Sequence, residues 1–348
     1  MKRFRIFIPA LAILMAAALS AAGQTPTKFT LKGNIDYILE SYDSGTVIES
    51  VALRQYPKMT LIGNGGGNIS YYGVFDGIPQ LAELVVDLTV PGGIGTTSLV
   101  FVLEEGTLVF DGKIVPHGGK LNNALRTLWE ELPKMKEKDA VAAIREFVSK
   151  EENAPASIIL LSGAIPFVGA ENAYDLALGA PQQVTSQRAF KPVFAKLEAQ
   201  ALLARNQKST DKGAMFKDFS VYYGGKLQSL SDYVGKGKYV LVDFWASWCG
   251  PCMQEIPNIV EVYKKYAGEQ FDVLGVAVND DPERSVGAVE KLQVPYPQII
   301  GAGSQIPAIY GIQGIPHLIL FAPDGTIVQR GMRGAQIEEA VKKALKLK

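Results

Sequence analysis

Between Lys28 and about Val115, short runs of β-branched and aromatic residues are separated by glycine, asparagine, aspartate and proline. This punctuation is typical of strands joined by turns. It predicts a β-rich N-terminal domain at residues 24–120, built as a small antiparallel sheet or sandwich. Within it, the run VFVLEEGTLVF has a turn signal at Glu105–Gly106 between two apolar stretches, which predicts a hairpin.

A helical spacing replaces this pattern in residues 121–206. Leu121, Leu125 and Leu128 recur at steps of four and three, as they would along one face of a helix. We therefore predict a helical connecting region. The polar stretch NQKSTDKG follows it without any apolar residue, and it predicts a linker at residues 207–214.

Strand and helix patterns alternate in residues 215–348. KYVLVDFWA and FDVLGVAVN are continuous apolar runs of the kind found in central, buried strands, and amphipathic helical segments follow both of them. PHLILFAPDGTIVQRG reads as two strands joined by a Pro-Asp-Gly turn, and AQIEEAVKKALKLK as a closing helix. The pattern predicts a second domain of α/β class, with helices on both faces of its sheet.

The first 23 residues have the order of a secretory signal peptide: Lys2, Arg3 and Arg5, then an apolar run, then small residues. We predict cleavage after Gly23 and export, to the periplasm in a bacterium; a retained membrane anchor is the alternative. The chain has 35 basic and 35 acidic residues, so removing three basic ones changes the formal net charge from 0 to −3. A balance this close to neutral argues against nucleic acid as a partner.

The two cysteines of the chain, Cys249 and Cys252, stand two residues apart at the start of a predicted helix. A bridge across so short a loop adds little stability, which favours a chemical role over a structural one. The helix N-terminus stabilises a thiolate at Cys249, and Cys252 lies one turn later, where it can resolve a mixed disulfide. Gly250 allows a close approach, and Pro251 suits a first helical turn. The spacing predicts a reversible dithiol switch.

Half of a zinc site also begins with CxxC, so metal binding is an alternative. Only His117 and His317 could add further nitrogen ligands, and the sequence has no second CxxC. We therefore predict no metal and no cofactor beyond the redox-active disulfide.

The stretch LVDFWASWCGPC looks like thioredoxin, and the segment from about Met215 to Lys348 resembles the secreted TlpA/ResA-type thiol-disulfide oxidoreductases. FSVYYGGKLQSLSDYVGKGKYV is similar to the hairpin that opens the fold of this family, and YGIQGIPHLILFAPDG to its cis-proline strand. The resemblance implies a thioredoxin fold for residues 215–348. The segment from Phe29 to about Leu132 resembles an uncharacterised β-domain that often precedes such modules.

The resemblance also implies roles for residues at matching positions. Cys249 would be the attacking thiol and Cys252 the resolving one, and Pro316 would be the cis-proline that faces the disulfide. Ile315 would pair its backbone with the bound substrate chain. Asp243 would be a buried carboxylate that transfers a proton at Cys252, the alternative being a paired structural acid.

Four further positions contribute to the predicted substrate surface. Trp248 would form a shelf beside the thiols, although it could equally serve in packing. His317 stands where the family commonly has threonine, and it either tunes the thiols or is an ordinary strand residue. Gly250 and Pro251 complete the surface around the thiols.

We predict an exported thiol-disulfide oxidoreductase that reduces disulfides in other exported proteins, because Gly-Pro between the cysteines is the thioredoxin dipeptide. No nucleotide-binding motif is present in the sequence, so the electron donor would be a membrane-linked thiol reductant. The alternative is a partner- or ligand-binding protein in which the thioredoxin module is accessory.

Overall fold

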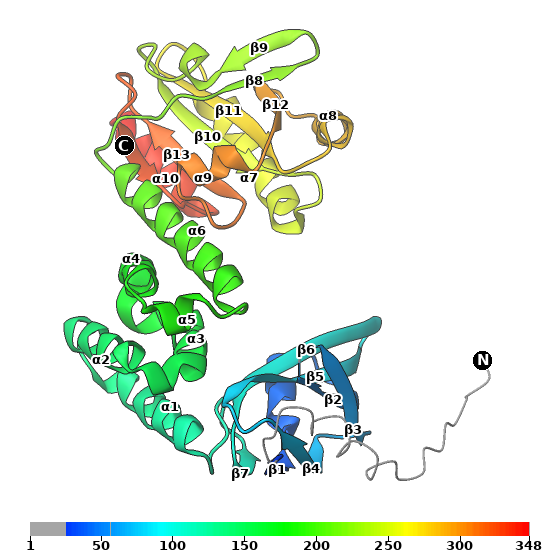
Figure 1. Cartoon of the computed structure of the whole chain (residues 1–348). Helices are drawn as coiled ribbons and strands as arrows, with labels where there is room; N and C mark the ends of the chain where they lie inside the picture. Colours follow the sequence, from blue (N-terminus) through cyan, green and yellow to red (C-terminus); the bar gives the residue numbers. More distant parts are fainter. Residues whose placement is uncertain (1–25, 56, 348) are drawn as a thin grey trace. The chain divides into compact units, whose positions relative to one another are not determined.

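The structure is a computed structural model that describes residues 26–55 and 57–347. The predicted signal peptide, residues 1–23, lies outside the described residues. The chain divides into two compact units, residues 1–197 and 198–348 (Figure 1). The predicted order is confirmed: β-rich and helical segments come first, and a thioredoxin-like α/β domain follows them.

The β-rich part of the first unit has two sheets that share one apolar core. The strand order is β4-β1-β7 in one sheet and β3-β2-β5-β6 in the other. Residues such as Leu31 and Leu84 are fully buried in the common core, so the β-branched and aromatic runs form a sandwich. The strands are β1 (Thr27–Asn34), β2 (Val47–Gln55), β3 (Lys58–Asn64), β4 (Asn68–Phe75), β5 (Gln80–Val90), β6 (Gly93–Leu103) and β7 (Gly106–Asp111), with a 3-10 turn, η2 (Asp36–Ser41), after β1.

The predicted hairpin at Glu105–Gly106 is wrong. β6 pairs with β5, whereas β7 crosses to the other sheet and runs parallel to β1. Glu104 lies at the crossing and is buried. Its carboxylate is stabilised there because it accepts hydrogen bonds from the backbone N–H groups of Leu121 (2.9 Å) and Asn122 (2.8 Å). It thereby caps the first helix, and the chain changes sheets there instead of turning back on itself.

The helical part of the first unit packs its apolar faces into a second core, to which β5 and β6 also contribute. The buried side chain of Asn122 joins the two parts by donating to the carbonyl oxygen of Val102 (2.7 Å) and accepting from its N–H (3.2 Å). The helices are α1 (Lys120–Glu131), α2 (Glu137–Ser149), α3 (Ala154–Ser162), α4 (Ile165–Leu178), α5 (Gln182–Thr185) and α6 (Phe190–Ser209), with short 3-10 turns η3 (Leu132–Lys134) and η4 (Glu151–Asn153).

The apolar segment around Ile158–Ala170 forms α3 and the start of α4. No single helix among the described residues is long and apolar enough to cross a membrane. The segments Glu151–Ser162 and Ile165–Leu178 reach that length and composition only together, and the chain bends by 116° between them.

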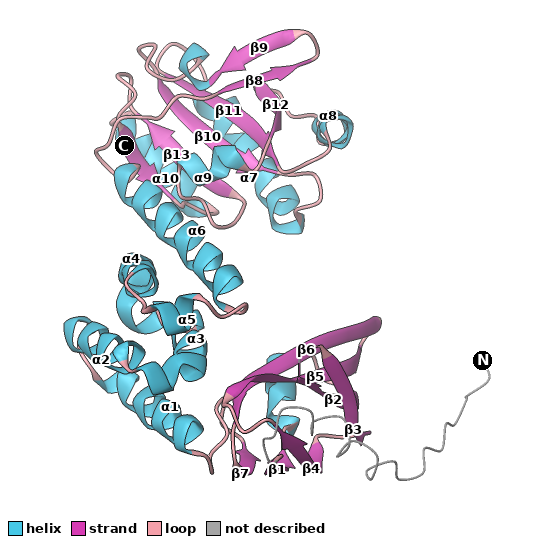
Figure 2. Ribbon diagram, in the orientation of Figure 1, coloured by secondary structure: helices cyan, strands magenta, loops and turns pink. Residues whose placement is uncertain are grey.

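The second unit is built on a five-stranded sheet of order β12-β11-β10-β13-β14 (Figure 2). Along β10, Val242 and Phe244 face a core shared with α9, whereas Leu241 faces the core shared with α7 and α10. The sheet is therefore covered on both faces, as its apolar strands predicted. The strands are β8 (Ser220–Tyr223), β9 (Lys226–Ser229), β10 (Tyr239–Trp245), β11 (Phe271–Val278), β12 (Gln298–Ala302), β13 (His317–Phe321) and β14 (Ile327–Arg330). The helices are η5 (Leu230–Asp232), α7 (Gly250–Tyr266), α8 (Pro282–Lys291), α9 (Gln305–Ile309) and α10 (Ala335–Ala344).

The predicted linker at residues 207–214 is not a free segment in the structure. Helix α6 continues to Ser209, and the unit boundary falls inside this helix, after Leu197. Thr210 is fully buried, and the backbone of Gly213 and Ala214 pairs with Ile327 of β14 at 2.8 Å in both directions. The polar sequence therefore belongs to the second unit, because long-range hydrogen bonds, and not apolar side chains, hold it there.

Candidate functional site

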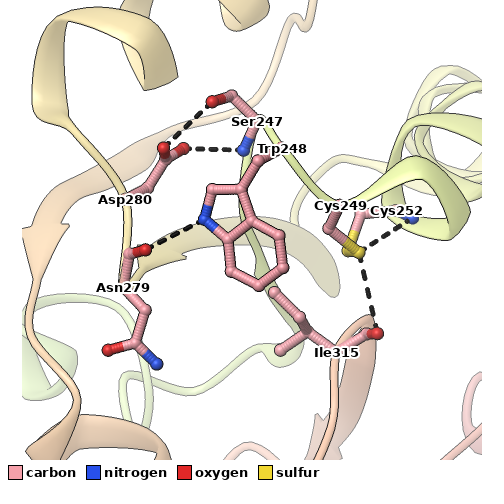
Figure 3. The surroundings of a disulfide bond; sticks show 7 residues. All are labelled: Ser247, Trp248, Cys249, Cys252, Asn279, Asp280 and Ile315. Carbon is pink, nitrogen blue, oxygen red and sulfur yellow. Dashed lines mark hydrogen bonds between the residues drawn. A yellow bond between two sulfur atoms is a disulfide. The ribbon is translucent and has the colours of Figure 1, made fainter. Parts of the chain in front are cut away.

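The two cysteines lie at the junction of β10 and α7 and are joined by a disulfide bond. Cys249 is the residue that caps α7, and its Sγ accepts the backbone N–H of Cys252 at 3.2 Å (Figure 3). Cys249 is 5% exposed, whereas Cys252 is fully buried. Once the disulfide is reduced, the helix N-terminus and this N–H favour the thiolate form of Cys249. The arrangement leaves one sulfur partly accessible and the other fully buried.

A depression of about 490 Å³ opens beside Cys249. None of the residues that line it is charged. One side is formed by Trp248 with Gly250 and Pro251, which begin α7. The other side is the segment that follows α9. The full lining is Trp248, Cys249, Gly250, Pro251, Asn279, Pro307, Ile312, Gln313, Gly314 and Ile315.

Ile315 and Pro316 bring the start of β13 to the disulfide. The peptide bond between them is cis. The carbonyl oxygen of Ile315 lies 3.6 Å from Cys249 Sγ (Figure 3). The oxidised sulfur has no proton to donate there, so this is a contact in the disulfide form. The structure thus brings together the cysteines, Trp248 and the segment before Pro316, as the resemblance implied.

Asp280, which follows strand β11, anchors the loop that carries Trp248. Asp280, directly after β11, accepts hydrogen bonds from Ser247 N (2.6 Å), Ser247 Oγ (3.0 Å) and Ser285 Oγ (2.7 Å). Burial alone would raise its pKa, but these hydrogen bonds outweigh it and lower the pKa of Asp280 below the usual value. Trp248 is 61% exposed, and its Nε1 donates to the carbonyl oxygen of Asn279 at 2.9 Å (Figure 3). Asp280 was not predicted from the sequence, although an acid just after a central strand is a signal that could have revealed it.

Asp243 lies in the middle of β10 and is 1% exposed. Its Oδ1 has no hydrogen-bond partner in the described part of the chain. Burial raises the pKa of Asp243 to about 7; the charge of Arg333 opposes this rise and that of Glu255 adds to it. A carboxyl group with such a pKa can take up and release a proton near neutral pH. The predicted alternative, a paired structural acid, has no support from its hydrogen bonding.

Glu255 is a second buried acid that the sequence analysis missed. It lies on α7, one turn after Cys252, and is 9% exposed. Its carboxylate accepts hydrogen bonds from Gly334 N (3.0 Å) and Asn258 Nδ2 (3.1 Å). An acid on the apolar face of an amphipathic helix was the signal that could have revealed it. Its negative charge adds to the rise in the pKa of Asp243.

His317 begins β13, opposite Phe244 of β10. Burial, together with the positive charges of Arg330 and Arg333, lowers the pKa of His317 to about 4. Its Nε2 has no hydrogen-bond partner within residues 26–55 and 57–347. No described hydrogen bond joins His317 to either cysteine, so its predicted role in tuning them stays a prediction. No group of three or more His, Cys, Asp or Glu residues in the same part of the chain could hold a metal ion.

Part of the chain is similar in sequence to known proteins. Residues 213–330 match the AhpC/TSA family. The thiol-disulfide oxidoreductase ResA of Bacillus thuringiensis is 30% identical over 122 residues, which cover 35% of this chain and 69% of that protein. ResA of Bacillus subtilis is 29% identical over 105 residues, or 30% of this chain and 58% of that protein. The solved thioredoxin domain of a thiol-disulfide oxidoreductase from Bacteroides vulgatus is 31% identical and covers 38% of this chain and 96% of that domain, with a TM-score of 0.35.

Proposed function

Because the chain belongs to the ResA/TlpA-type family of thioredoxin-like thiol-disulfide oxidoreductases, we propose that it reduces disulfide bonds in exported proteins through Cys249 and Cys252. The observation that carries this proposal is the position of the two sulfurs. Cys249 caps α7 at the edge of an uncharged depression, and Cys252 is buried behind it. The asymmetry suits an attacking and a resolving thiol.

The reaction has two exchange steps. In the reduced protein, the Cys249 thiolate attacks one sulfur of the substrate disulfide, which forms a mixed disulfide and releases the other substrate sulfur as a thiolate. The Cys252 thiolate then attacks Cys249 Sγ, which forms the intramolecular disulfide and releases the second substrate thiolate. Two electrons pass from the protein to the substrate. Asp243, with its pKa raised to about 7, would accept the proton of Cys252 before the second step.

The depression beside Cys249 supports a protein substrate over a charged small molecule. Its lining has no charged side chain, and Trp248 presents an exposed indole face. The backbone of Ile315 lies next to the reacting sulfur, where it could pair with an extended chain. We therefore propose that substrates present a cystine flanked by uncharged residues in an accessible, extended segment.

The proposal also includes export of the protein and an external source of electrons. The N-terminal order of basic, apolar and small residues supports export with cleavage near Gly23. Outside the cytosol, where disulfides persist, the reduced state of Cys249 and Cys252 must be restored by another thiol. A membrane-linked thiol reductant is the proposed donor, and no cofactor beyond the disulfide is required.

The proposal is tested by trapping the intermediate with Cys252→Ala. Without Cys252 no thiol of the same chain can attack the mixed disulfide. The variant should therefore accumulate adducts with exported proteins that disappear on adding reductant. Cys249→Ala is the matched control and should trap little, because Cys252 is fully buried. Neither variant forming adducts, together with no reduction of a peptide disulfide by the wild type, would refute the proposed function.

A further inference from the structure

One wall of the depression beside Cys249 is formed by the segment from Pro307 to Ile315. We call this segment the cleft wall. It contains the end of α9, Gly311 and the residues that lead to the cis peptide bond before Pro316. The last two turns of α6, residues 203–209, and Thr210 directly after them lie against it.

Gly311 is the point of closest approach between the cleft wall and α6. Its φ is +61°, a conformation that side-chain-bearing residues rarely adopt. A Cβ atom at this position would overlap the backbone of Leu203 and Gln207 on α6. The helix backbone therefore rests on the backbone of the wall, and no side chain separates them.

Hydrogen bonds join the same two segments on either side of Gly311. Asn206 Nδ2 donates to the carbonyl oxygen of Ala308 at 2.8 Å. The guanidinium of Arg330 donates to the carbonyl oxygens of Thr210 (2.8 Å) and Tyr310 (2.7 Å), and so links the end of α6 to the wall. The Thr210 hydroxyl accepts a further bond from Arg330 at 2.9 Å, and it can donate to the carbonyl oxygen of Asn206 (2.6 Å) or of Tyr310 (3.1 Å). Thr210 is fully buried, so losing these bonds would leave polar groups without water.

We propose that the end of α6 holds the cleft wall in the geometry that binds protein substrates, with Thr210 and Arg330 as positioning residues. The inference rests on the proposed function, because it concerns binding of a chain beside Cys249. The end of α6 acts through Gly311 and Tyr310 on the adjoining residues Ile312–Ile315, which line the depression. It touches neither sulfur, so it should affect recognition of a chain and leave the intrinsic reactivity of Cys249 unchanged.

The test is Thr210→Val in the full chain, which keeps the shape of the side chain and removes its hydroxyl. For a peptide disulfide, KM should rise roughly three- to tenfold, the range expected for losing a buried hydrogen bond or two. The rate with a small aromatic disulfide reagent, which needs no cleft wall, should be unchanged. Thr210→Ser retains the hydroxyl and should restore the wild-type KM.

Thr46→Val is a matched control in the first unit, where the Thr46 hydroxyl donates to the carbonyl oxygen of Asp43 at 2.8 Å. It should leave KM unchanged. An unchanged KM in Thr210→Val would overturn the inference, and so would an equal loss of both activities that follows the melting temperature. If the wild type does not reduce the peptide and neither cysteine variant forms adducts, the proposed function fails, and hydrogen exchange decides the inference separately. Amides of residues 307–315 should exchange faster in Thr210→Val, and equal exchange would refute the positioning role.

Discussion

Replacing Asp243 with asparagine should stabilise the oxidised protein, and more so as the pH rises. Burial raises the pKa of this carboxyl from 3.8 to about 7. An acid whose pKa is higher in the folded state binds its proton more tightly there. The free energy of unfolding therefore falls as the pH rises from 3.8 to about 7. At about 1.4 kcal/mol per pH unit, the full loss is about 4 kcal/mol. Asparagine cannot ionise, so Asp243→Asn escapes this loss.

The measurement is denaturant unfolding of oxidised wild type and Asp243→Asn at pH 5 and pH 8.5. At pH 5 the wild type has already lost part of this free energy of unfolding. The difference in free energy of unfolding between Asp243→Asn and the wild type should therefore grow by about 3 kcal/mol from pH 5 to pH 8.5. Glu283→Gln removes a carboxylate from an exposed position and is the matched control. Its stability relative to the wild type should differ little between the two conditions, because the substitution removes no buried charge.

The same variant tests the proposed proton transfer. The rate of peptide disulfide reduction by the wild type should change near pH 7 as Asp243 ionises, and Asp243→Asn should be slower and lack this change. A constant stability difference between pH 5 and 8.5 would refute the raised pKa. Identical rate profiles from pH 6 to 9 would refute the catalytic role while leaving the stability argument intact.

Three further outcomes follow from the structure. In the reduced protein, Cys249 should react with iodoacetamide before Cys252, with a pKa below the free-thiol value of about 8.5; faster modification of Cys252 would reverse their roles. Asp280→Ala should slow peptide reduction about tenfold and alter Trp248 fluorescence, because Ser247 loses both bonds to this carboxylate; wild-type rate and fluorescence would contradict its anchoring role. A fragment of residues 198–348 should melt at a higher temperature than one of residues 215–348, which lacks Thr210, a partner of Arg330; equal melting temperatures would show that residues 198–214 add no stability.

The sequence located the redox centre because its signals are local. The spacing of Cys249 and Cys252 places them on one helical turn, and an apolar strand leads directly to them. The raised pKa of Asp243 was also predictable, since a lone acid inside an apolar strand is desolvated. Asp280 and Glu255 escaped notice because their significance depends on which distant N–H groups they accept from, and no local pattern encodes that.

The two errors in the fold have the same origin. The turn signal at Glu105–Gly106 predicted a hairpin, but the carboxylate of the preceding residue, Glu104, accepts a helix N–H 17 residues later in the chain. A linker was predicted at 207–214 because the stretch 206–213, NQKSTDKG, has no apolar residue. It is held by Arg330, which is 120 residues away in sequence from Thr210. Local patterns predict elements, whereas the partners of buried polar groups determine how the elements are joined.

The pairing of Gly213 and Ala214 with Ile327 has a consequence for how the protein behaves at high local concentration. β14 is the last strand on its side of the sheet, and a bare edge strand is a template on which another chain can add. Here the chain covers that edge with its own backbone, next to the isolated bridge between Met215 and Thr326. A variant cut at residue 215 would lose this cover. We expect such a variant to form β-sheet-rich aggregates when concentrated, even where its redox centre remains intact.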